Sequence, residues 1–369
     1  MRIIYSDKHL RHDPSALIVK DNPLEFSELP ARAEIIRAAV ESAGLGPIVP
    51  PTDHGLDPIL AVHDAGFVNY LQTAYARLSD CFKEPTPVFA DTFATRLSIP
   101  RAPKGILAQI GYYAFGIGSP IMEGTWDAAY WSAQCALSAA DAISPLPLGE
   151  GPGARAAYAL CRPPGHHAAR DLYGGFCYLN NAAIAAHYLQ HSPPHFGEPR
   201  ERGASHGSGE RLKVAILDFD YHHGNGTQSI FYSDPNVLFC SIHADPNDEY
   251  PYYWGFADER GEGAGLGFNR NFPLQPGTED AAYLDTLAEA LNVIRDFDPR
   301  YLVVSAGFDI FTGDPVGGFN VTTEGIAKIG EAIAGLNLPT VIVQEGGYLQ
   351  EALGKNAVAF LSAFEEEHH

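Results

Sequence analysis

The chain of 369 residues is long enough to bury a large core, because 46% of its residues are hydrophobic and 11% are aromatic. Its formal net charge is −21, from 45 acidic and 24 basic residues, and no basic cluster could neutralise a row of phosphates. Nucleic acid is therefore not an expected partner. An acidic surface would attract cationic substrates, although acidity that serves only solubility explains the charge equally well.

The five cysteines are scattered and never form a C-x-x-C pair, which predicts reduced thiols. The N-terminal sequence MRIIYSDKH reaches charged residues too soon for a signal peptide. No apolar run approaches the roughly 18 residues of a membrane-spanning helix. We therefore expect a cytoplasmic protein with no membrane partner, built as one domain over residues 1–364 with a tail at 365–369.

The first third of the chain predicts a strand and then three helices. The expected elements are a strand at Arg2–Tyr5 and helices at Pro30–Gly44, Asp57–Leu78 and Thr125–Ile143. Between the last two helices, residues 79–124 are rich in proline and glycine but also contain the apolar run GILAQIGYYAF. This stretch is too apolar for a disordered linker, so we expect an insertion packed against something, such as another subunit.

The rest of the chain alternates apolar runs with helical segments such as Thr278–Phe297. The predicted strands are Tyr158–Cys161, Val214–Leu217, Val237–Cys240, Tyr301–Val304 and Val341–Val343. This order predicts an α/β fold with a doubly wound, mostly parallel sheet flanked by helices. Two polar loops, 145–155 and 192–211, are expected to be surface excursions.

The stretch KVAILDFDYHHGNG carries the clearest chemical signal. Its apolar run shows no alternation, as expected of a strand covered on both faces. Asp218, Asp220 and His222 follow at a spacing of two. If the backbone stays extended there, the three side chains point to one side and offer the oxygen and nitrogen ligands that divalent metals need.

Three other predicted strands also end in polar motifs: CRPPGHH with His166 and His167, SAGFD with Asp309, and QEGGY with Tyr348. Each motif alone has an ordinary explanation, such as a helix cap for Asp309. The carboxyl ends of parallel strands meet at one edge of a sheet, where open α/β folds bind ligands. The joint placement therefore favours one crevice that contains all four motifs.

These residue types suit a metal-assisted amide or ester hydrolase. Asp220, His222 and Asp309 offer three ligands and leave one position on a divalent ion open, as in catalytic zinc sites. The histidine pair can exchange protons near neutral pH. The hydroxyl of Tyr348 can donate a hydrogen bond to a developing oxyanion.

Five motifs, CRPPGHHA, GGFCYLNNAAIA, DFDYHHGNGTQ, SAGFDIFTGDP and EGGY, resemble the zinc-dependent deacetylases of the arginase/deacetylase superfamily. Within it the chain looks like the bacterial acetylpolyamine amidohydrolase branch, which is similar to class II histone deacetylases. The resemblance runs from Met1 to about Ser362. It implies the arginase/deacetylase fold, removal of acetyl or similar short acyl groups from amines, one Zn²⁺ per chain with Fe²⁺ or Co²⁺ as alternatives, a structural K⁺ and a homodimer.

The same resemblance assigns roles to residues. The implied zinc ligands are Asp220, His222 and Asp309, and the implied catalytic residues are His166, His167 and Tyr348. His167 would be the general base and acid, with His166 as its electrostatic partner, while Tyr348 would bind the carbonyl oxygen. Asp218 would orient His166 and Asn225 would orient His167. An amide at position 225, where some relatives carry an acid, should leave His167 less basic.

Two further sites follow from the resemblance. The implied potassium ligands are backbone oxygens of Asp218, Asp220, His222 and Ile242 and the side chain of Ser241. Phe176 and Tyr250 resemble the aromatic pair that walls the substrate tunnel, although simple core packing stays open for Tyr250.

The insertion departs from the branch pattern. In the polyamine branch this segment builds a dimer that narrows the tunnel mouth, and it supplies acids for the distal ammonium groups of the substrate. We expect residues 79–124 at a dimer interface, but Leu107 and Gly118 occupy the positions of those acids. Glu123 or Asp91 could substitute. The substrate therefore stays open between acetylated polyamines, acyl-lysine-like groups and other small acetylated amines.

Three other functions agree less well with the sequence. A binuclear manganese ureohydrolase of the same superfamily would need further acid and histidine ligands. A protein that only binds acyl ligands or metal would not need every catalytic position filled. Nucleotide binding at Gly261–Gly267 fails on the G-x-G-x-x-G spacing, and no strand leads into that stretch.

Overall fold

The computed structural model describes residues 1–17, 27–81, 87–94, 101–144, 155–191 and 211–367. In these ranges eight strands form one sheet in the order β2-β1-β3-β8-β7-β4-β5-β6, and every neighbouring pair is parallel. The predicted α/β class is therefore confirmed. No helix among the described residues combines the length and the hydropathy needed to cross a bilayer.

The strands are β1 (Arg2–Ile4), β2 (Ile48–Val49), β3 (Ala156–Ala159), β4 (Val214–Asp218), β5 (Val237–Ala244), β6 (Asn269–Leu274), β7 (Tyr301–Ala306) and β8 (Thr340–Gln344). The α-helices are α1 (Ala31–Ser42), α2 (Asp57–Val62), α3 (Ala65–Ser79), α4 (Ile106–Tyr113), α5 (Thr125–Ile143), α6 (Asn181–Gln190), α7 (Asn225–Phe231), α8 (Asp280–Phe297), α9 (Thr323–Ala334) and α10 (Gln350–Glu367).

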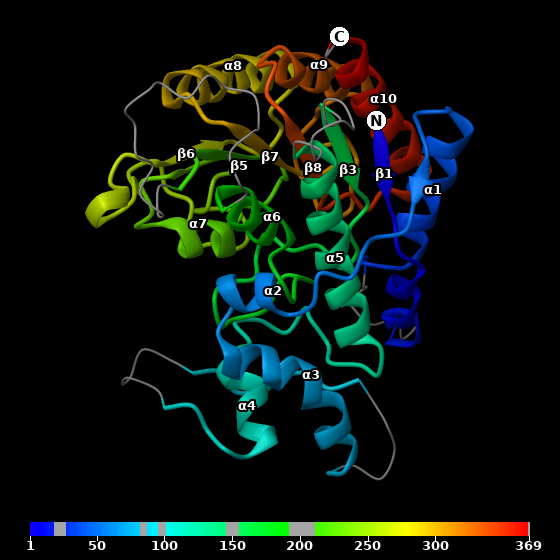
Figure 1. Cartoon of the computed structure of the whole chain (residues 1–369), viewed down its shortest axis with the longest axis vertical. Helices are drawn as coiled ribbons and strands as arrows, with labels where there is room; N and C mark the ends of the chain where they lie inside the picture. Colours follow the sequence, from blue (N-terminus) through cyan, green and yellow to red (C-terminus); the bar gives the residue numbers. More distant parts are fainter. Residues whose placement is uncertain (18–26, 82–86, 95–100, 145–154, 192–210, 368–369) are drawn as a thin grey trace, which may run out of the picture.

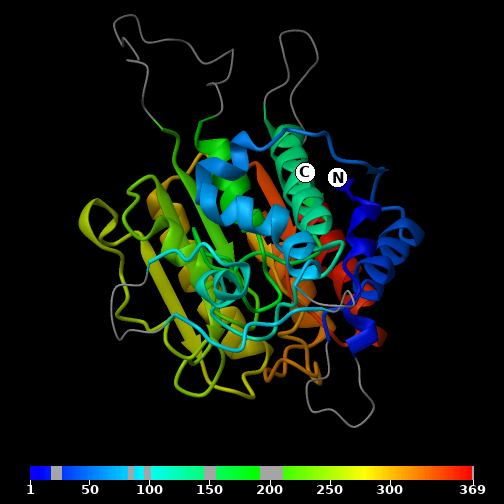
Figure 2. The same ribbon diagram turned by 90° about the horizontal axis from the view of Figure 1, so that it is seen from below.

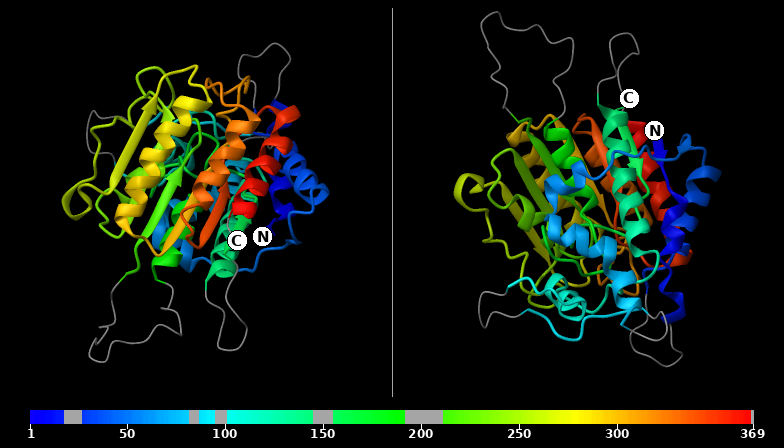
Figure 3. Two further views of the ribbon diagram at one scale, coloured as in Figure 1. Left: turned by 90° about the horizontal axis from the view of Figure 1, so that it is seen from above. Right: turned by 60° about the horizontal axis from the view of Figure 1, so that its bottom comes forward.

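Helices cover both faces of the sheet. Figure 1 shows α8, α9 and α10 above the sheet and α2, α5, α6 and α7 below it, and the left view in Figure 3 shows the upper helices side by side over the sheet, roughly along the strands. Successive side chains of a strand point to opposite faces. Ile216 accordingly packs in the core with α5 and α6, whereas Leu217 packs in the core with α1, α8, α9 and α10. The unbroken apolar run of β4 therefore reflects burial on both sides.

The edges of the sheet explain which strands the sequence pattern missed. β2 has only two residues, and β6 carries Asn269, Asn271 and Pro273, so neither reads as a typical strand. Proline is tolerated in β6 because this strand lies at the edge. The predicted strand Tyr158–Cys161 starts two residues earlier in the structure, at Ala156.

The alanine-rich helix α5 has the predicted bounds, whereas the single helix predicted over Asp57–Leu78 is wrong. Two helices, α2 and α3, occupy that range. His63 adopts an extended conformation between them, and its ring nitrogen Nδ1 lies 2.9 Å from the carbonyl oxygen of Ala169. The Asp64 side chain then caps α3 by accepting hydrogen bonds from the amides of Gly66 and Phe67.

The described part of the insertion at 79–124 contains α4 and a bridge between Val88 and Ile121. Helices α3 and α4 lie beyond the lower helical layer, at the end of the molecule that faces the viewer in Figure 2. The two polar loops lie outside the described residues, except for positions 155 and 211. Helix α10 continues through Glu367, and the ammonium group of Met1 pairs with Glu365, so the two ends of the chain meet.

Candidate functional site

Four neighbouring strands of the sheet, β3, β8, β7 and β4, carry the polar motifs at their carboxyl ends. Parallel pairing places these ends at one edge, so the motifs converge as predicted. All four motifs lie together at this edge of the sheet.

The side chains of Asp220, His222 and Asp309 form a buried group of potential metal ligands. One ligand atom from each lies within 4.8 Å of the other two. The ring nitrogen Nδ1 of His222 is 3.2 Å from Asp220 Oδ1 and 3.2 Å from Asp309 Oδ2. Two carboxylates and one imidazole at this separation suit a single divalent cation with an open coordination position.

The electrostatics of this group also fit a cation. Burial raises the pKa of Asp309 and the neighbouring charge of Asp220 raises it further, to about 7. Two buried carboxylates side by side are unfavourable unless a positive charge compensates them. A divalent ion between them would supply that charge.

Backbone amides fix the two carboxylates in place. Asp309 Oδ1 accepts a hydrogen bond from the amide of Tyr221 at 2.9 Å. Asp309 is not a helix cap, because the next helix begins only at Thr323. Asp220 Oδ2 accepts one from the amide of Gly346 at 2.8 Å. A Cβ atom at Gly346 would lie 2.3 Å from Asp309 Oδ2, so only glycine lets the backbone come this close.

Asp218 lies at the same edge of the sheet, but it contacts His166 and is not part of the group of potential metal ligands. Its Oδ2 atom accepts a hydrogen bond from Nδ1 of His166 at 3.0 Å, and it is fully buried. This bond leaves Nε2 of His166 on the side of the metal-ligand group, 3.7 Å from Asp220 Oδ1. Burial lowers the pKa of His166, but the charges of Asp218 and Asp220 outweigh it and raise the pKa to about 10.

His167 has the opposite character, although its ring centre is only 4.0 Å from that of His166. Its Nδ1 donates to Oδ1 of Asn225 at 2.7 Å, which leaves the Nε2 lone pair free. Burial and the charges of His166 and His222 hold its pKa far below the ordinary value. The hydrogen bond to the neutral amide of Asn225 opposes this lowering only in part.

A buried arginine that no motif indicated holds the loop of Tyr348. Arg32 donates from Nε to the carbonyl oxygen of Gly347 at 2.6 Å and from Nη2 to that of Glu345 at 2.7 Å. Its guanidinium carbon lies 4.5 Å from the centre of the Tyr348 ring. Glu28 Oε1 forms an ion pair with Nη1 of Arg32 at 2.9 Å. The i,i+4 spacing of these two residues in the segment FSELPAR was the only sign of the buried pair in the sequence.

Glu345 is a second residue that the sequence analysis missed. Its Oε2 atom accepts hydrogen bonds from the amides of Gly165 at 2.6 Å and His166 at 3.2 Å, which joins the EGGY loop to the histidine pair. Glu345, His166 and Cys177 also form a group with metal-ligand spacing. Burial raises the pKa of the Cys177 thiol well above its ordinary value, and this thiol donates to the carbonyl oxygen of Gly175 at 3.3 Å.

The two predicted tunnel residues lie beside the catalytic candidates. The Phe176 ring is 5.8 Å from that of Tyr348, and its backbone has a φ of 66°, a strained value for a residue other than glycine. The Tyr250 ring stands edge-on to His167 at 5.0 Å and lies 6.0 Å from His222. Tyr250 therefore contacts two of the candidate site residues, and its role in a substrate tunnel stays a prediction.

The candidate potassium ligands meet across two strands, since Asp218 and Ser241 are register partners in β4 and β5. His243 Nε2 must donate to the carbonyl oxygen of Gly255 at 2.9 Å, so Nδ1 accepts from the Ser241 hydroxyl at 2.8 Å. Burial lowers the pKa of His243 to about 4, in line with this neutral ring. The lone pairs of Ser241 Oγ therefore remain available to a cation, and the potassium site stays a prediction.

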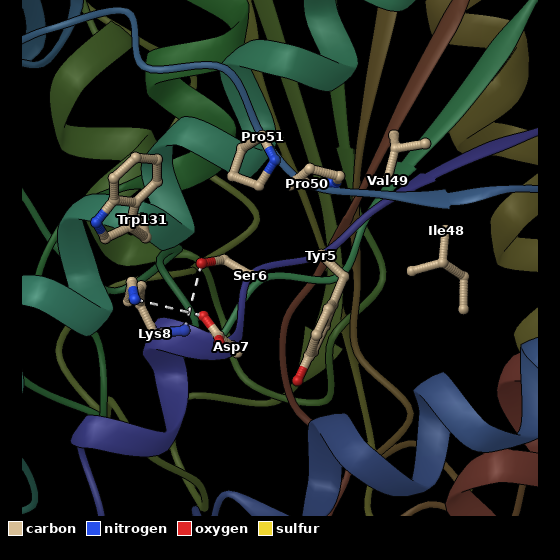
Figure 4. Close-up of a pocket in the computed structure, with 9 residues that line it drawn as sticks. All are labelled: Tyr5, Ser6, Asp7, Lys8, Ile48, Val49, Pro50, Pro51 and Trp131. Carbon is tan, nitrogen blue, oxygen red and sulfur yellow. Dashed lines mark hydrogen bonds and ion pairs between the residues drawn. The ribbon is translucent and has the colours of Figure 1, made fainter.

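A separate pocket of about 470 Å³ lies beyond β1 and β2 (Figure 4). It is lined by Tyr5, Ser6, Asp7, Lys8, Ile48, Val49, Pro50, Pro51 and Trp131. None of the candidate site residues lines it. The two charged residues of the pocket form an ion pair, with Lys8 Nζ 3.7 Å from Asp7 Oδ1.

Comparisons with known proteins agree with this geometry. The model of the histone deacetylase domain matches residues 27–364. The chain is 42% identical to acetylpolyamine amidohydrolase 1 of Pseudomonas aeruginosa, over 99% of both chains. It is 43% identical to the acetylpolyamine amidohydrolase of Burkholderia pseudomallei, over 98% of this chain and 97% of that protein.

A crystal structure of the acetylpolyamine aminohydrolase from Burkholderia pseudomallei superimposes with a TM-score of 0.87 and 41% identity, covering 100% of this chain and 99% of that one. The match confirms the expected arginase/deacetylase type of fold over the whole length. The shared sheet, the ordered motifs and the family match together show that the chain belongs to the histone deacetylase domain family.

Proposed function

We propose that the protein hydrolyses the acetyl amide bond of acetylated polyamines or related small acetylated amines, with one divalent ion, zinc, per chain. Members of its family are metal-dependent hydrolases that act on amides, and the relatives named above are acetylpolyamine amidohydrolases. One observation carries the proposal: two neighbouring histidines of opposite basicity lie beside a buried group of two carboxylates and one imidazole. Fe²⁺ and Co²⁺ are the alternative ions.

In this proposal Asp220, His222 and Asp309 hold the ion. When bound, the ion polarises the amide carbonyl and lowers the pKa of water. His167, kept neutral by burial and oriented by Asn225, takes a proton from the attacking water and returns it to the leaving amine.

His166, paired with Asp218, carries positive charge beside the reaction centre and stabilises negative charge that develops there. Tyr348 donates its hydroxyl to the carbonyl oxygen. Burial keeps the pKa of this hydroxyl well above its ordinary value, so the proton is present to be donated. Arg32 and Asp314 fix the Tyr348 backbone, the latter by accepting from its amide at 2.7 Å.

The remaining parts of the proposal concern surroundings of the site. A structural K⁺ would bind the backbone oxygens of Asp218, Asp220, His222 and Ile242 and the hydroxyl of Ser241. A homodimer would form through the insertion at 79–124, supported by the exposed Leu107 and Ile117 in that segment. The scattered thiols support a cytoplasmic location, and the net charge of −21 argues against nucleic acid as a partner.

The first test replaces the two groups proposed to move or donate protons. His167→Ala and Tyr348→Phe should fold and retain metal but lose roughly 100- to 10,000-fold in kcat on acetylputrescine. Circular dichroism and metal analysis check the folding and the metal content. His191→Ala, an exposed histidine at the end of α6, is the matched control and should be fully active. Full activity of either site variant would refute the assignment.

A substrate panel separates the alternatives. It contains acetylputrescine, acetylcadaverine, acetylspermidine, acetyl-lysine peptides and small acetamides. Preference for the small amines supports the proposal, whereas equal rates on bulky peptides would favour a peptide deacetylase. Two manganese ions per chain would indicate a ureohydrolase. A lack of hydrolysis with zinc, iron(II) and cobalt would favour a protein that only binds acyl ligands.

A further inference from the structure

A continuous series of aromatic rings leads from the catalytic candidate His167 to the protein surface. Tyr250 stands edge-on to His167 at 5.0 Å, and Phe115 stacks on Tyr250 at 6.4 Å. Trp254 meets Phe115 edge-on at 6.4 Å, and Tyr253 meets Trp254 at 5.9 Å. The rings thus connect the reaction centre to a loop outside it.

The outer members of this series are exposed. Tyr252, Tyr253 and Trp254, which we name the aromatic loop, have exposed fractions of 49%, 69% and 38%. Among the described residues these three are the only aromatic side chains in the set of exposed large hydrophobic residues. Three consecutive exposed rings next to a reaction centre indicate a binding surface for a ligand group.

The aromatic loop is held rigidly on the protein. The amide of Gly255 donates to Glu259 Oε2 at 2.8 Å, and the carbonyl oxygen of Gly255 accepts from His243. The amide of Tyr252 donates to the carbonyl oxygen of Glu249 at 3.0 Å. These bonds fix the backbone on both sides of Tyr253 and Trp254, so little backbone entropy is lost when a ligand binds to the loop.

Relatives of the polyamine branch are expected to carry an acid at a position near Phe176. This chain has no charged side chain at that position. Gly118 lies there, and a Cβ atom built on it would be 3.7 Å from the Phe176 ring. Leu107, at the other expected position, is exposed and apolar. Neither position therefore supplies a charge to the free ammonium end of an acetylated diamine, which leaves this role to the exposed acids Asp91 and Glu123 or to another group.

We propose that the faces of Trp254 and Tyr253, supported by Phe115, bind the distal ammonium group of the substrate through cation–π contacts. Aromatic faces attract organic ammonium ions, and tryptophan does so most strongly. The inference rests on the proposed deacetylase function and deepens it. It assigns the selection of the cationic far end of the substrate to aromatic rings in place of carboxylates.

The test compares two substrates that differ in charge but little in shape, N-acetylcadaverine and N-hexylacetamide. Trp254→Leu should raise KM for N-acetylcadaverine by roughly five- to thirtyfold, because leucine keeps apolar bulk but has no aromatic face. The same variant should change KM for N-hexylacetamide less than about twofold, and kcat for both should stay within that range. Trp254→Phe, which keeps a ring, should retain most of the preference for the charged substrate.

Several outcomes would overturn the inference. An equal rise of KM for both substrates would mean that Trp254 provides only apolar contact. Loss of the charge preference in Asp248→Asn, which removes the exposed carboxylate next to the loop, would assign the ammonium to that carboxylate. A change of molecular mass of Trp254→Leu in light scattering would make the loop an interface between two copies. If the unmodified enzyme hydrolyses neither substrate, the deacetylase function itself fails.

Discussion

The floor and the rim of the site differ in how the chain builds them. The floor consists of side chains at the ends of four adjacent strands, and Asp220 and Asp309 are buried there under backbone hydrogen bonds. The rim consists of the aromatic loop and part of the insertion, where Leu107, Ile117 and Tyr253 are exposed. In the proposed function, the chemistry would depend on groups that the core of the protein fixes, whereas the choice of substrate would depend on surface segments.

The largest expected effect lies on the floor. Asp309→Asn keeps the shape of the side chain but removes the charge that a metal ligand needs. The variant should lose bound metal and at least about a thousandfold in kcat, since the ion takes part in every proposed step. Elemental analysis of the purified protein and kinetics on acetylcadaverine measure the two losses.

The matched control is Asp298→Asn at the exposed end of α8. Asp298 has a φ of 52°, which asparagine adopts readily, so this variant should keep both metal and activity. Retention of one metal ion per chain in Asp309→Asn would contradict the proposed ligand set.

A smaller effect is expected for the residue that supports the floor from behind. Arg32→Met would remove the hydrogen bonds that two buried carbonyl oxygens of the Tyr348 loop accept, and it would leave Glu28 with Arg162 as its remaining ion-pair partner. The free energy of unfolding should fall by about 3–5 kcal/mol, and kcat by roughly 10- to 100-fold, as for other residues that orient active-site groups. Chemical denaturation and steady-state kinetics check the two values.

Arg37→Met provides the comparison on the same helix. Arg37 is partly exposed and pairs with Glu34 and Glu41, so its loss should cost at most about 1 kcal/mol and leave kcat unchanged. Equal effects of the two arginine variants would show that Arg32 acts only as part of α1.

The smallest effect is expected at the rim. Gly118→Glu places a carboxylate near Phe176, and the added Cβ makes only an ordinary contact with that ring. KM for acetylcadaverine should fall by about two- to fivefold, the range of an exposed ion pair, with kcat unchanged. Gly118→Gln should not lower KM, because it adds similar bulk without charge. A change in kcat, or the same result with glutamine, would mean that the rim and the floor are not separable.

The sequence was informative where one local pattern is sufficient. Unbroken apolar runs predicted the central strands, because both faces of the sheet are covered. The edge strands β2 and β6 escaped the pattern, since one is very short and the other is half polar. The predicted helix over Asp57–Leu78 was wrong because His63 and Asp64 are compatible with a helix locally, and only contacts with distant residues break it.

The same limit applies to the site. The spacing of two residues predicted that Asp218, Asp220 and His222 point to one side. Spacing alone could not show that Asp218 accepts a hydrogen bond from His166, whereas Asp309 lies with Asp220 and His222 in the group of potential metal ligands. Arg32 and Glu345 act through backbone carbonyls and amides of distant loops. Such bonds leave no pattern in a sequence, because any residue can offer its backbone as the partner.

The hydrogen bonds of His243 join the two parts of the site. Ser241, next to the proposed cation, donates to His243, which donates in turn to the Gly255 carbonyl that ends the aromatic loop. Only the tautomer of His243 that carries its proton on Nε2 satisfies both hydrogen bonds, so the direction of each bond is fixed. If an alkali ion binds beside Ser241 as proposed, a change in the size of that ion would act on the aromatic loop through these two hydrogen bonds.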